Sequence, residues 1–197
     1  MTAQPMTTRI ALLALVAAVQ IAILGKIVTD RVSLLRTGRE IVLPITPVDP
    51  RDLFRGDYVI LAYPLSQIAA ASLPPGTSLK NLRENRDVYV VIHPEPDQSW
   101  KIVAVEPAYP KTVATDDAVL KGRVVNIWNR SDAAADEWVQ IHYGIERYFV
   151  PEGTGRALEE RVQERAMQAI VAVGADGAAA LKGLILDGKR HEDPPLF

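Results

Sequence analysis

An apolar segment close to the N-terminus, residues 10–28, constrains this chain more than any other feature. Gln20 and Lys26 are its only strongly polar residues. At the rise of an α-helix, its length is about that of the ~30 Å hydrocarbon core of a bilayer. Lys26 lies near the end of the segment, where a long side chain can extend to the headgroups. We therefore expect a transmembrane helix that contacts the lipid bilayer through residues 10–28.

A cleaved signal peptide is the alternative explanation for this segment. Cleavage requires small residues behind the apolar core. The candidate site, Val-Ala-Ala at residues 16–18, would leave a core that is too short. An uncleaved anchor is therefore favoured. Apolar residues continue the helical pattern past residue 28 as far as Gly38, which is a natural helix terminator. We assign residues 1–38 to the anchor and its extension.

The remainder of the chain carries patterns typical of β-strands, separated by turn-forming residues. Strands are expected at residues 41–43, 58–63, 87–93, 100–105, 118–128, 138–143, 146–150, 169–173 and 178–186. Hairpins are expected to join 87–93 to 100–105 and 169–173 to 178–186, with a bulge at Gly122, a turn of helix within residues 68–73 and a short helix over residues 156–165. The fold class is therefore mainly β: a small antiparallel sheet or partly open barrel with short helices, preceded by one N-terminal transmembrane helix. Residues 39–190 form this domain, and residues 191–197 a flexible tail.

Composition excludes several classes of function. The 197 residues carry a formal net charge of -2, so there is no bulk basic signal for nucleic acid. Cysteine is absent, which excludes disulfides, thiol nucleophiles and thiolate metal sites. The histidines are isolated in the sequence, and no phosphate loop or dinucleotide fingerprint is present. We expect no metal and no cofactor.

The segment from Asp49 to Leu65 joins a polar, turn-rich half to an apolar half at Gly56-Asp57. Gly56 can adopt a positive φ, and the carboxylate of Asp57 can bond to the backbone of the turn. Residues 58–63 have largely apolar side chains on both faces, so this strand is expected to be covered on both sides. Its two tyrosines, Tyr58 and Tyr63, should point to opposite faces, with their hydroxyls bonded to backbone groups.

The sequence of residues 56–63 within this segment resembles the signature of the GDYXXLXY protein family. The five fixed letters of that signature fall on Gly56, Asp57, Tyr58, Leu61 and Tyr63. A second run, residues 143–153 (Tyr-Gly-Ile-Glu-Arg-Tyr-Phe-Val-Pro-Glu-Gly), is also similar to one in the family. The resemblance implies a membrane-anchored bacterial domain, outside the cytoplasm, with no assigned activity.

The charges that flank the apolar segment disagree with that location. Arg9 precedes the segment, whereas Lys26, Arg31, Arg36 and Arg39 lie at its end or follow it. The positive-inside rule therefore favours a cytoplasmic domain. Following the resemblance instead, we expect a single-pass membrane protein of the cell envelope whose main domain is periplasmic.

Two functional hypotheses follow. The first is an interaction or scaffold module whose partner is another membrane or envelope protein and whose surface lies where residues 52–63 meet residues 146–155. Its candidate residues are Asp52, Arg55, Gly56, Asp57, Tyr58, Leu61, Tyr63, Tyr143, Gly144, Glu146, Arg147, Tyr148, Pro151, Glu152 and Gly153. The alternative is an extracytoplasmic hydrolase with Asp57, Glu146 or Glu152 as catalytic carboxylates, since paired carboxylates can cleave glycosidic bonds. We favour the first, with Glu146 in an ion pair with Arg51 or Arg55.

A weaker, local similarity links residues 50–57 to the box of type I signal peptidases. When the two are aligned on Gly56-Asp57, the position of the nucleophilic serine falls on Val48. Valine has no oxygen with which to attack, so peptidase chemistry cannot run at this position. Lys101 could stand at the place of the general base in such a scaffold, although an exposed lysine is the simpler interpretation.

Overall fold

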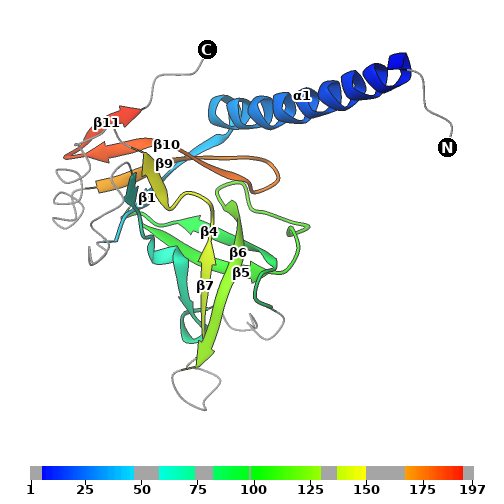
Figure 1. The fold of residues 1–197 in the computed structure, drawn as a ribbon. Helices are drawn as coiled ribbons and strands as arrows, with labels where there is room; N and C mark the ends of the chain where they lie inside the picture. The colour runs from blue at the N-terminus through cyan, green and yellow to red at the C-terminus, as the bar shows by residue number, and fades with distance from the viewer. Residues whose placement is uncertain are drawn as a thin grey trace.

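The computed structural model describes residues 6–46, 58–73, 82–97, 99–129, 137–149 and 167–192. In this part of the chain, one long N-terminal helix precedes a body built from antiparallel β-strands and two short 3-10 turns (Figure 1). The fold class is therefore mainly β, as the sequence predicts.

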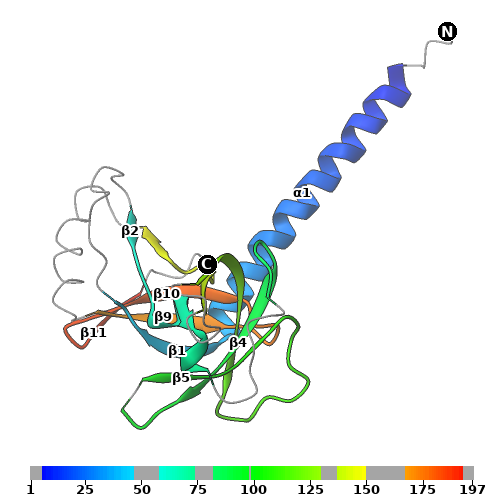
Figure 2. The ribbon, with the colours of Figure 1, turned by 90° about the horizontal axis from the view of Figure 1, so that it is seen from below.

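Helix α1 (Met6–Thr37) contains the predicted transmembrane segment and its extension without a break. It projects away from the β-strands along most of its length (Figure 2). The helix ends at Gly38, whose N–H donates to the carbonyl of Leu34 at 2.9 Å. A Cβ at Gly38 would lie 2.5 Å from that carbonyl oxygen and 3.2 Å from the Cβ of Ala172. Glycine is therefore required where the helix meets the domain.

Two sheets and a ribbon make up the described body, and all of their pairings are antiparallel. The strands are β1 (Arg39–Pro44), β2 (Tyr58–Ile60), β3 (Gln67–Ala69), β4 (Asp87–Pro94), β5 (Trp100–Glu106), β6 (Ala118–Asn129), β7 (Glu137–His142), β8 (Arg147–Phe149), β9 (Met167–Val173), β10 (Ala179–Leu186) and β11 (Lys189–Glu192). The four-stranded sheet has the order β1-β9-β10-β11, the five-stranded sheet the order β3-β7-β6-β4-β5, and β2 pairs with β8.

Apolar side chains from the two separate sheets share one core. Leu43 and Val171 from the four-stranded sheet and Ile92 and Leu120 from the five-stranded sheet are almost fully buried in this core. Hydrogen bonds also join the sheets. The indole N–H of Trp100 donates to the carbonyl of Val42 at 2.7 Å, and the amide of Lys121 donates to the carbonyl of Gly177 at 2.8 Å.

The predicted hairpins are confirmed as β4–β5 and β9–β10. The predicted bulge at Gly122 is wrong: the register against β7 shifts between Val124 and Asn126. Gly122 has a different role, because a Cβ there would collide with the side chain of Ile141 on β7. The absence of a side chain permits close packing of β6 on β7. The helical turn expected within residues 68–73 is present as the 3-10 turn η2 (Ala70–Ser72), and a similar turn, η1 (Pro64–Ser66), precedes β3.

The predicted strand over residues 58–63 changes partners halfway. It pairs with β8 only as far as Ile60, and Ala62 then forms an isolated bridge with Thr46. The expectation that both faces are covered is wrong at Ile60, whose side chain is 49% exposed. Leu61, the next residue after the ribbon, is by contrast 1% exposed.

Strand structure reaches two residues into the segment that was predicted as a tail. Asp187 and Gly188 both have positive φ, 49° and 76°, as a two-residue hairpin turn of type I′ requires. The turn brings β11 back along β10 as far as Glu192. The predicted helix over residues 156–165 lies outside the described residues.

Candidate functional site

The two sequence runs that resemble the family signature meet in space. Strand β2 pairs with β8, so Ile60 lies opposite Arg147. Just beyond the ribbon, the amide of Leu61 donates to the carbonyl of Glu146 at 2.8 Å. We call residues 58–65 together with residues 143–149 the motif junction.

Two buried tyrosines connect the halves of the motif junction in opposite directions. The hydroxyl of Tyr63 donates to the carbonyl of Ile145 at 2.8 Å, and the hydroxyl of Tyr143 donates to the carbonyl of Leu65 at 2.7 Å. Their exposed fractions are 3% and 5%. Each hydroxyl therefore satisfies a carbonyl that water cannot easily reach. The expectation that Tyr63 bonds to the backbone is confirmed.

Burial raises the pKa of Tyr63 and of Tyr143 far above the ordinary value for a phenol. The negative charge of Glu146 adds a smaller effect in the same direction. Both hydroxyls therefore keep their protons at any physiological pH. A neutral hydroxyl is a hydrogen-bond donor, which is the role that both tyrosines have here.

The carboxylate of Glu146 folds back on its own turn. One oxygen accepts from the amide of Tyr143 at 2.5 Å, and the other accepts from the amide of Gly144 at 2.9 Å. Gly144 has a φ of 78°, a conformation that few other residues adopt without strain. In this geometry Glu146 shapes the turn, and both of its oxygens bond to backbone amides. The ion pair expected with Arg51 or Arg55 would involve residues outside the described part of the chain.

The other predicted site residues differ in burial, and several lie outside the described residues. Leu61 is a core residue, and Arg147 is exposed on β8. Tyr58 and Tyr148 lie on the paired strands of the ribbon. Seven candidates lie outside the described residues: Asp52, Arg55, Gly56, Asp57, Pro151, Glu152 and Gly153. The hydrolase hypothesis depends on the separation of Glu146 from Asp57 or Glu152, two of these residues outside the described part of the chain. Val48 is outside as well, and Lys101 is exposed on β5.

Sequence reasoning missed a second site, where the helix meets the sheets. A groove of about 1060 Å³ opens between the C-terminal third of α1, the loop before β6 and the β9–β10 turn. Arg31 reaches across it and donates to the carbonyl of Ala179 at 3.0 Å. Arg39 donates to three carbonyls of the loop before β6, those of Thr115, Asp116 and Asp117. We call this space the helix-foot groove.

In the sequence, Arg31 and Arg39 are visible only as charges that flank the apolar segment and bear on membrane orientation. Their long-range contacts join residues 148 and about 77 positions apart, which no local pattern reveals.

A histidine lies within hydrogen-bond distance of a carboxylate beside this groove. The Nδ1 atom of His93 lies 2.6 Å from a carboxylate oxygen of Asp117, which lines the groove. Within the described residues, no group of three or more His, Asp or Glu side chains is arranged to hold a metal ion.

Comparisons with known proteins agree with the motif junction. No curated protein and no solved structure matches the chain. The family model described as "GDYXXLXY protein" matches residues 20–184, which include both halves of the motif junction and most of the described strands. The chain therefore belongs to the GDYXXLXY protein family.

Proposed function

We propose that this protein is a single-pass membrane protein that presents its β-rich domain outside the cytoplasm as an interaction module of the cell envelope. The observation that supports this proposal is the length and the exposed apolar surface of helix α1. Residues Ile10–Thr37 are long and apolar enough to cross a membrane, and no part of the most apolar window is buried against the domain.

Leu13 and Ile21, for example, are 68% and 70% exposed. Such a large apolar surface is unfavourable in water, and a bilayer is the environment that removes the cost. The helix also enters the domain at one end only, which leaves residues 10–28 free to span. The periplasmic side is the one that the resemblance to the family signature implies, against the flanking charges.

The motif junction is the proposed contact surface. Ile60 is exposed on the outer face of the β2–β8 ribbon, with Arg147 opposite it on β8. An exposed apolar side chain beside an arginine is a common combination at protein interfaces. The buried tyrosines behind the ribbon fix its position without presenting groups of their own. The partner is another membrane or envelope protein.

Location is tested by fusing a periplasm-active and a cytoplasm-active reporter to the C-terminus in separate strains. We expect the chain to stay in the membrane fraction after an alkaline wash, with only the periplasmic reporter active. Activity of the cytoplasmic reporter alone would overturn the proposed side and support the flanking charges. Recovery of the chain in the soluble fraction would overturn the anchor itself.

Partner contact is tested by placing a photo-crosslinking amino acid at Ile60 in native membranes. Tyr63 is unsuitable because it is buried. The matched control is Val125, which is 40% exposed on β6. We expect a discrete adduct with an envelope protein from position 60 and none from position 125. Equal labelling from the two positions, or none from either, would contradict a specific interface at the ribbon.

A further inference from the structure

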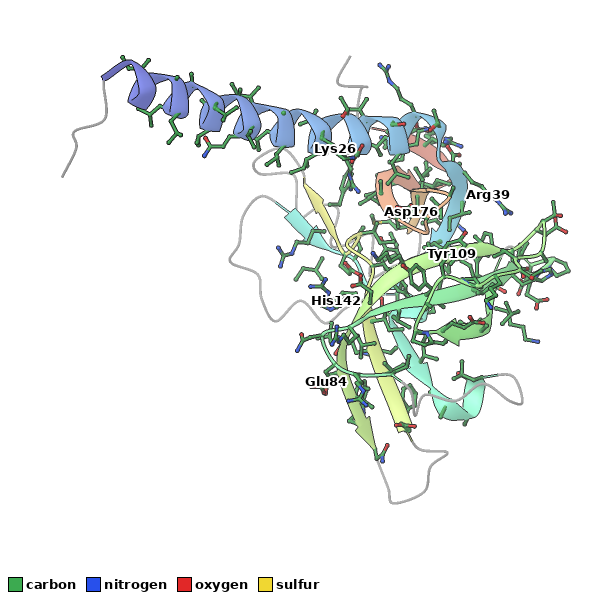
Figure 3. The ribbon with its side chains drawn as sticks, turned by 90° about the vertical axis from the view of Figure 1, so that its right-hand side faces the viewer. Lys26, Arg39, Glu84, Tyr109, His142 and Asp176 are labelled. Carbon is green, nitrogen blue, oxygen red and sulfur yellow. The ribbon has the colours of Figure 1, made fainter. Side chains whose placement is uncertain are left out.

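The helix-foot groove lies where the helix must leave the bilayer if residues 10–28 span it. Ile27, Arg31 and Leu34 line it from the helix side. Tyr109 and Asp176 line it from the domain side, and Figure 3 shows both on the part of the domain that faces α1. The groove is therefore continuous with the surface that lipid would contact.

Helix geometry sets the depth of each wall residue. Residues 10–28 have a length of ~28 Å at about 1.5 Å per residue, close to the thickness of the hydrocarbon core. Arg31 then lies about 4–5 Å beyond the core, within the headgroup layer. Leu34 and Gly38 lie farther out, so the helix side of the groove extends outward from the edge of the hydrocarbon core.

Two charges of opposite sign flank the same turn. The Nη1 atom of Arg31 donates to the carbonyl of Ala179, and one oxygen of Asp176 accepts from the amide of Ala178 at 3.0 Å. A guanidinium has five N–H donors, so Arg31 can donate to this carbonyl and to a phosphate together. A carboxylate has two oxygens, so Asp176 can accept a further hydrogen bond.

Other charged groups around the groove already bond within the protein. A carboxylate oxygen of Asp30 lies 2.6 Å from the Nζ atom of Lys26, and one of Asp117 lies 2.6 Å from the Nδ1 atom of His93. Arg39 donates to the three carbonyls of the loop before β6 at 2.7–3.2 Å. Arg31 and Asp176 each bond to a single backbone group, so they are one cation and one anion of the groove wall with hydrogen-bonding capacity left, and Asp176 also lies within electrostatic range of Lys121. This pair matches a ligand that carries both charges.

We propose that the helix-foot groove binds the headgroup of a zwitterionic phospholipid with a primary amine, its phosphate on Arg31 and its ammonium on Asp176. The apolar wall at Ile27 and Val113 suits the glycerol end of the lipid and the start of its chains. Tyr109, 42% exposed, has the amphipathic character of residues at membrane interfaces. The inference rests on the proposed membrane anchoring. It goes further by assigning a specific lipid site.

The test is native mass spectrometry of the full chain released from nanodiscs that contain equal amounts of phosphatidylethanolamine and phosphatidylglycerol. We expect the wild type to retain one phosphatidylethanolamine. Arg31→Gln should reduce this retention about tenfold, since it removes a charge-assisted contact. Asp176→Asn keeps the bond to the Ala178 amide and should abolish the preference for the amine lipid. Arg31→Lys should restore part of the retention.

The matched control is Arg83→Gln. Arg83 is exposed and neighbours Glu84, which Figure 3 shows at the end of the domain remote from α1. This variant should retain lipid as the wild type does. Equal loss in both glutamine variants, or wild-type retention in Arg31→Gln, would overturn the site. A preference of the wild type for phosphatidylglycerol would overturn the zwitterionic assignment, and displacement of the lipid by excess inorganic phosphate would show a general anion site instead.

Two further measurements distinguish failure of the proposed lipid site from failure of the proposed membrane anchoring. Tryptophan fluorescence shows whether each variant is folded before its lipid is counted. Alkaline washing of the membranes shows whether each variant remains anchored. A folded, anchored wild type that retains no phospholipid would overturn the lipid site and leave the proposed anchoring intact. A wild type found in the soluble fraction would overturn both.

Discussion

The motif junction and the helix foot connect segments that are distant in the sequence, but they do so by opposite means. At the motif junction, Tyr63 and Tyr143 are buried, and neutral hydroxyls bond to backbone carbonyls. At the helix foot, charged side chains make the connections: Arg39 donates to the loop before β6, and Glu40 lies between Lys182 and Arg190. We use "helix foot" for residues 31–40 and their partners.

This difference shows where the family signature acts. Two of the fixed positions of the signature, Leu61 and Tyr63, are core residues that hold the β2–β8 ribbon against the sheets. A buried polar bond is costly to lose, because the group left behind has no water to replace its partner. Exposed ion pairs are individually worth little. Leu61 and Tyr63 therefore belong to the framework of the domain, whereas Arg31 and Arg39 of the open, charged site lie outside the signature.

The largest expected effect on stability comes from truncating a buried residue of the signature. Leu61→Ala should destabilise the domain by about 2–5 kcal/mol, because it leaves a cavity in a packed core. The control is its neighbour Ile60→Ala, which lies on the exposed ribbon face and should cost far less. Urea unfolding of the full chain in detergent, followed by tryptophan fluorescence, measures both. Equal losses would remove the contrast between the buried and exposed sides of the junction.

The next effect concerns a single hydroxyl. Tyr143→Phe should cost about 1–3 kcal/mol, because the buried carbonyl of Leu65 loses its donor. Tyr109→Phe is the matched control at the helix-foot groove, where water can solvate an exposed phenol. We expect a change within about 0.5 kcal/mol there. If the two variants unfold at the same urea concentration, burial does not distinguish the two regions.

The stability lost on replacing Glu146 should lie between the losses for Tyr143→Phe and Tyr109→Phe, because the carboxylate of Glu146 is only partly buried. Glu146→Ala should cost about 1 kcal/mol and speed hydrogen exchange at the amides of Tyr143 and Gly144. Glu146→Gln keeps one acceptor and should have a smaller effect on both quantities. Unchanged exchange at these two amides in the alanine variant would contradict the role of Glu146 in shaping the turn.

Local features of the fold could be predicted from the sequence. The β9–β10 hairpin follows from the turn residues Gly174 to Gly177, and the β4–β5 hairpin follows from two β-branched runs separated by proline and aspartate. Helix α1 follows from apolar length alone. In each case, a short segment contains both the strand or helix pattern and the residues that end it.

The remaining features depend on partners that are distant in the chain. The pairing of β1 with β9 and the change of partner at Ala62 leave no periodic trace in their own segments. The bulge was assigned to Gly122 because glycine often marks one, but the packing of Ile141 explains that glycine better. Likewise, the bond of Arg31 to Ala179 depends on how α1 meets β10. Side-chain chemistry at both sites therefore depends on the long-range topology.

The smallest expected effect lies at the helix foot, where it depends on pH and salt. Burial alone would raise the pKa of Glu40, but the hydrogen bonds and charges of Arg190 and Lys182 outweigh it and hold that pKa below its ordinary value of 4.5. A lowered pKa in the folded state means that Glu40 contributes stability above about pH 4.5 and loses it as the pH falls through the folded value.

Glu40→Gln should therefore cost less than about 1 kcal/mol at pH 7 in low salt, because ion pairs of this exposure contribute little. The difference from the wild type should shrink at high salt, which screens the charges, and again below pH 4.5. Glu106→Gln, at an exposed position on β5, serves as the control. Urea unfolding at pH 7 and at pH 3 measures the difference. A cost that survives both salt and acid would mean that Glu40 acts through packing, and the helix foot would then resemble the motif junction more closely than its exposed charges indicate.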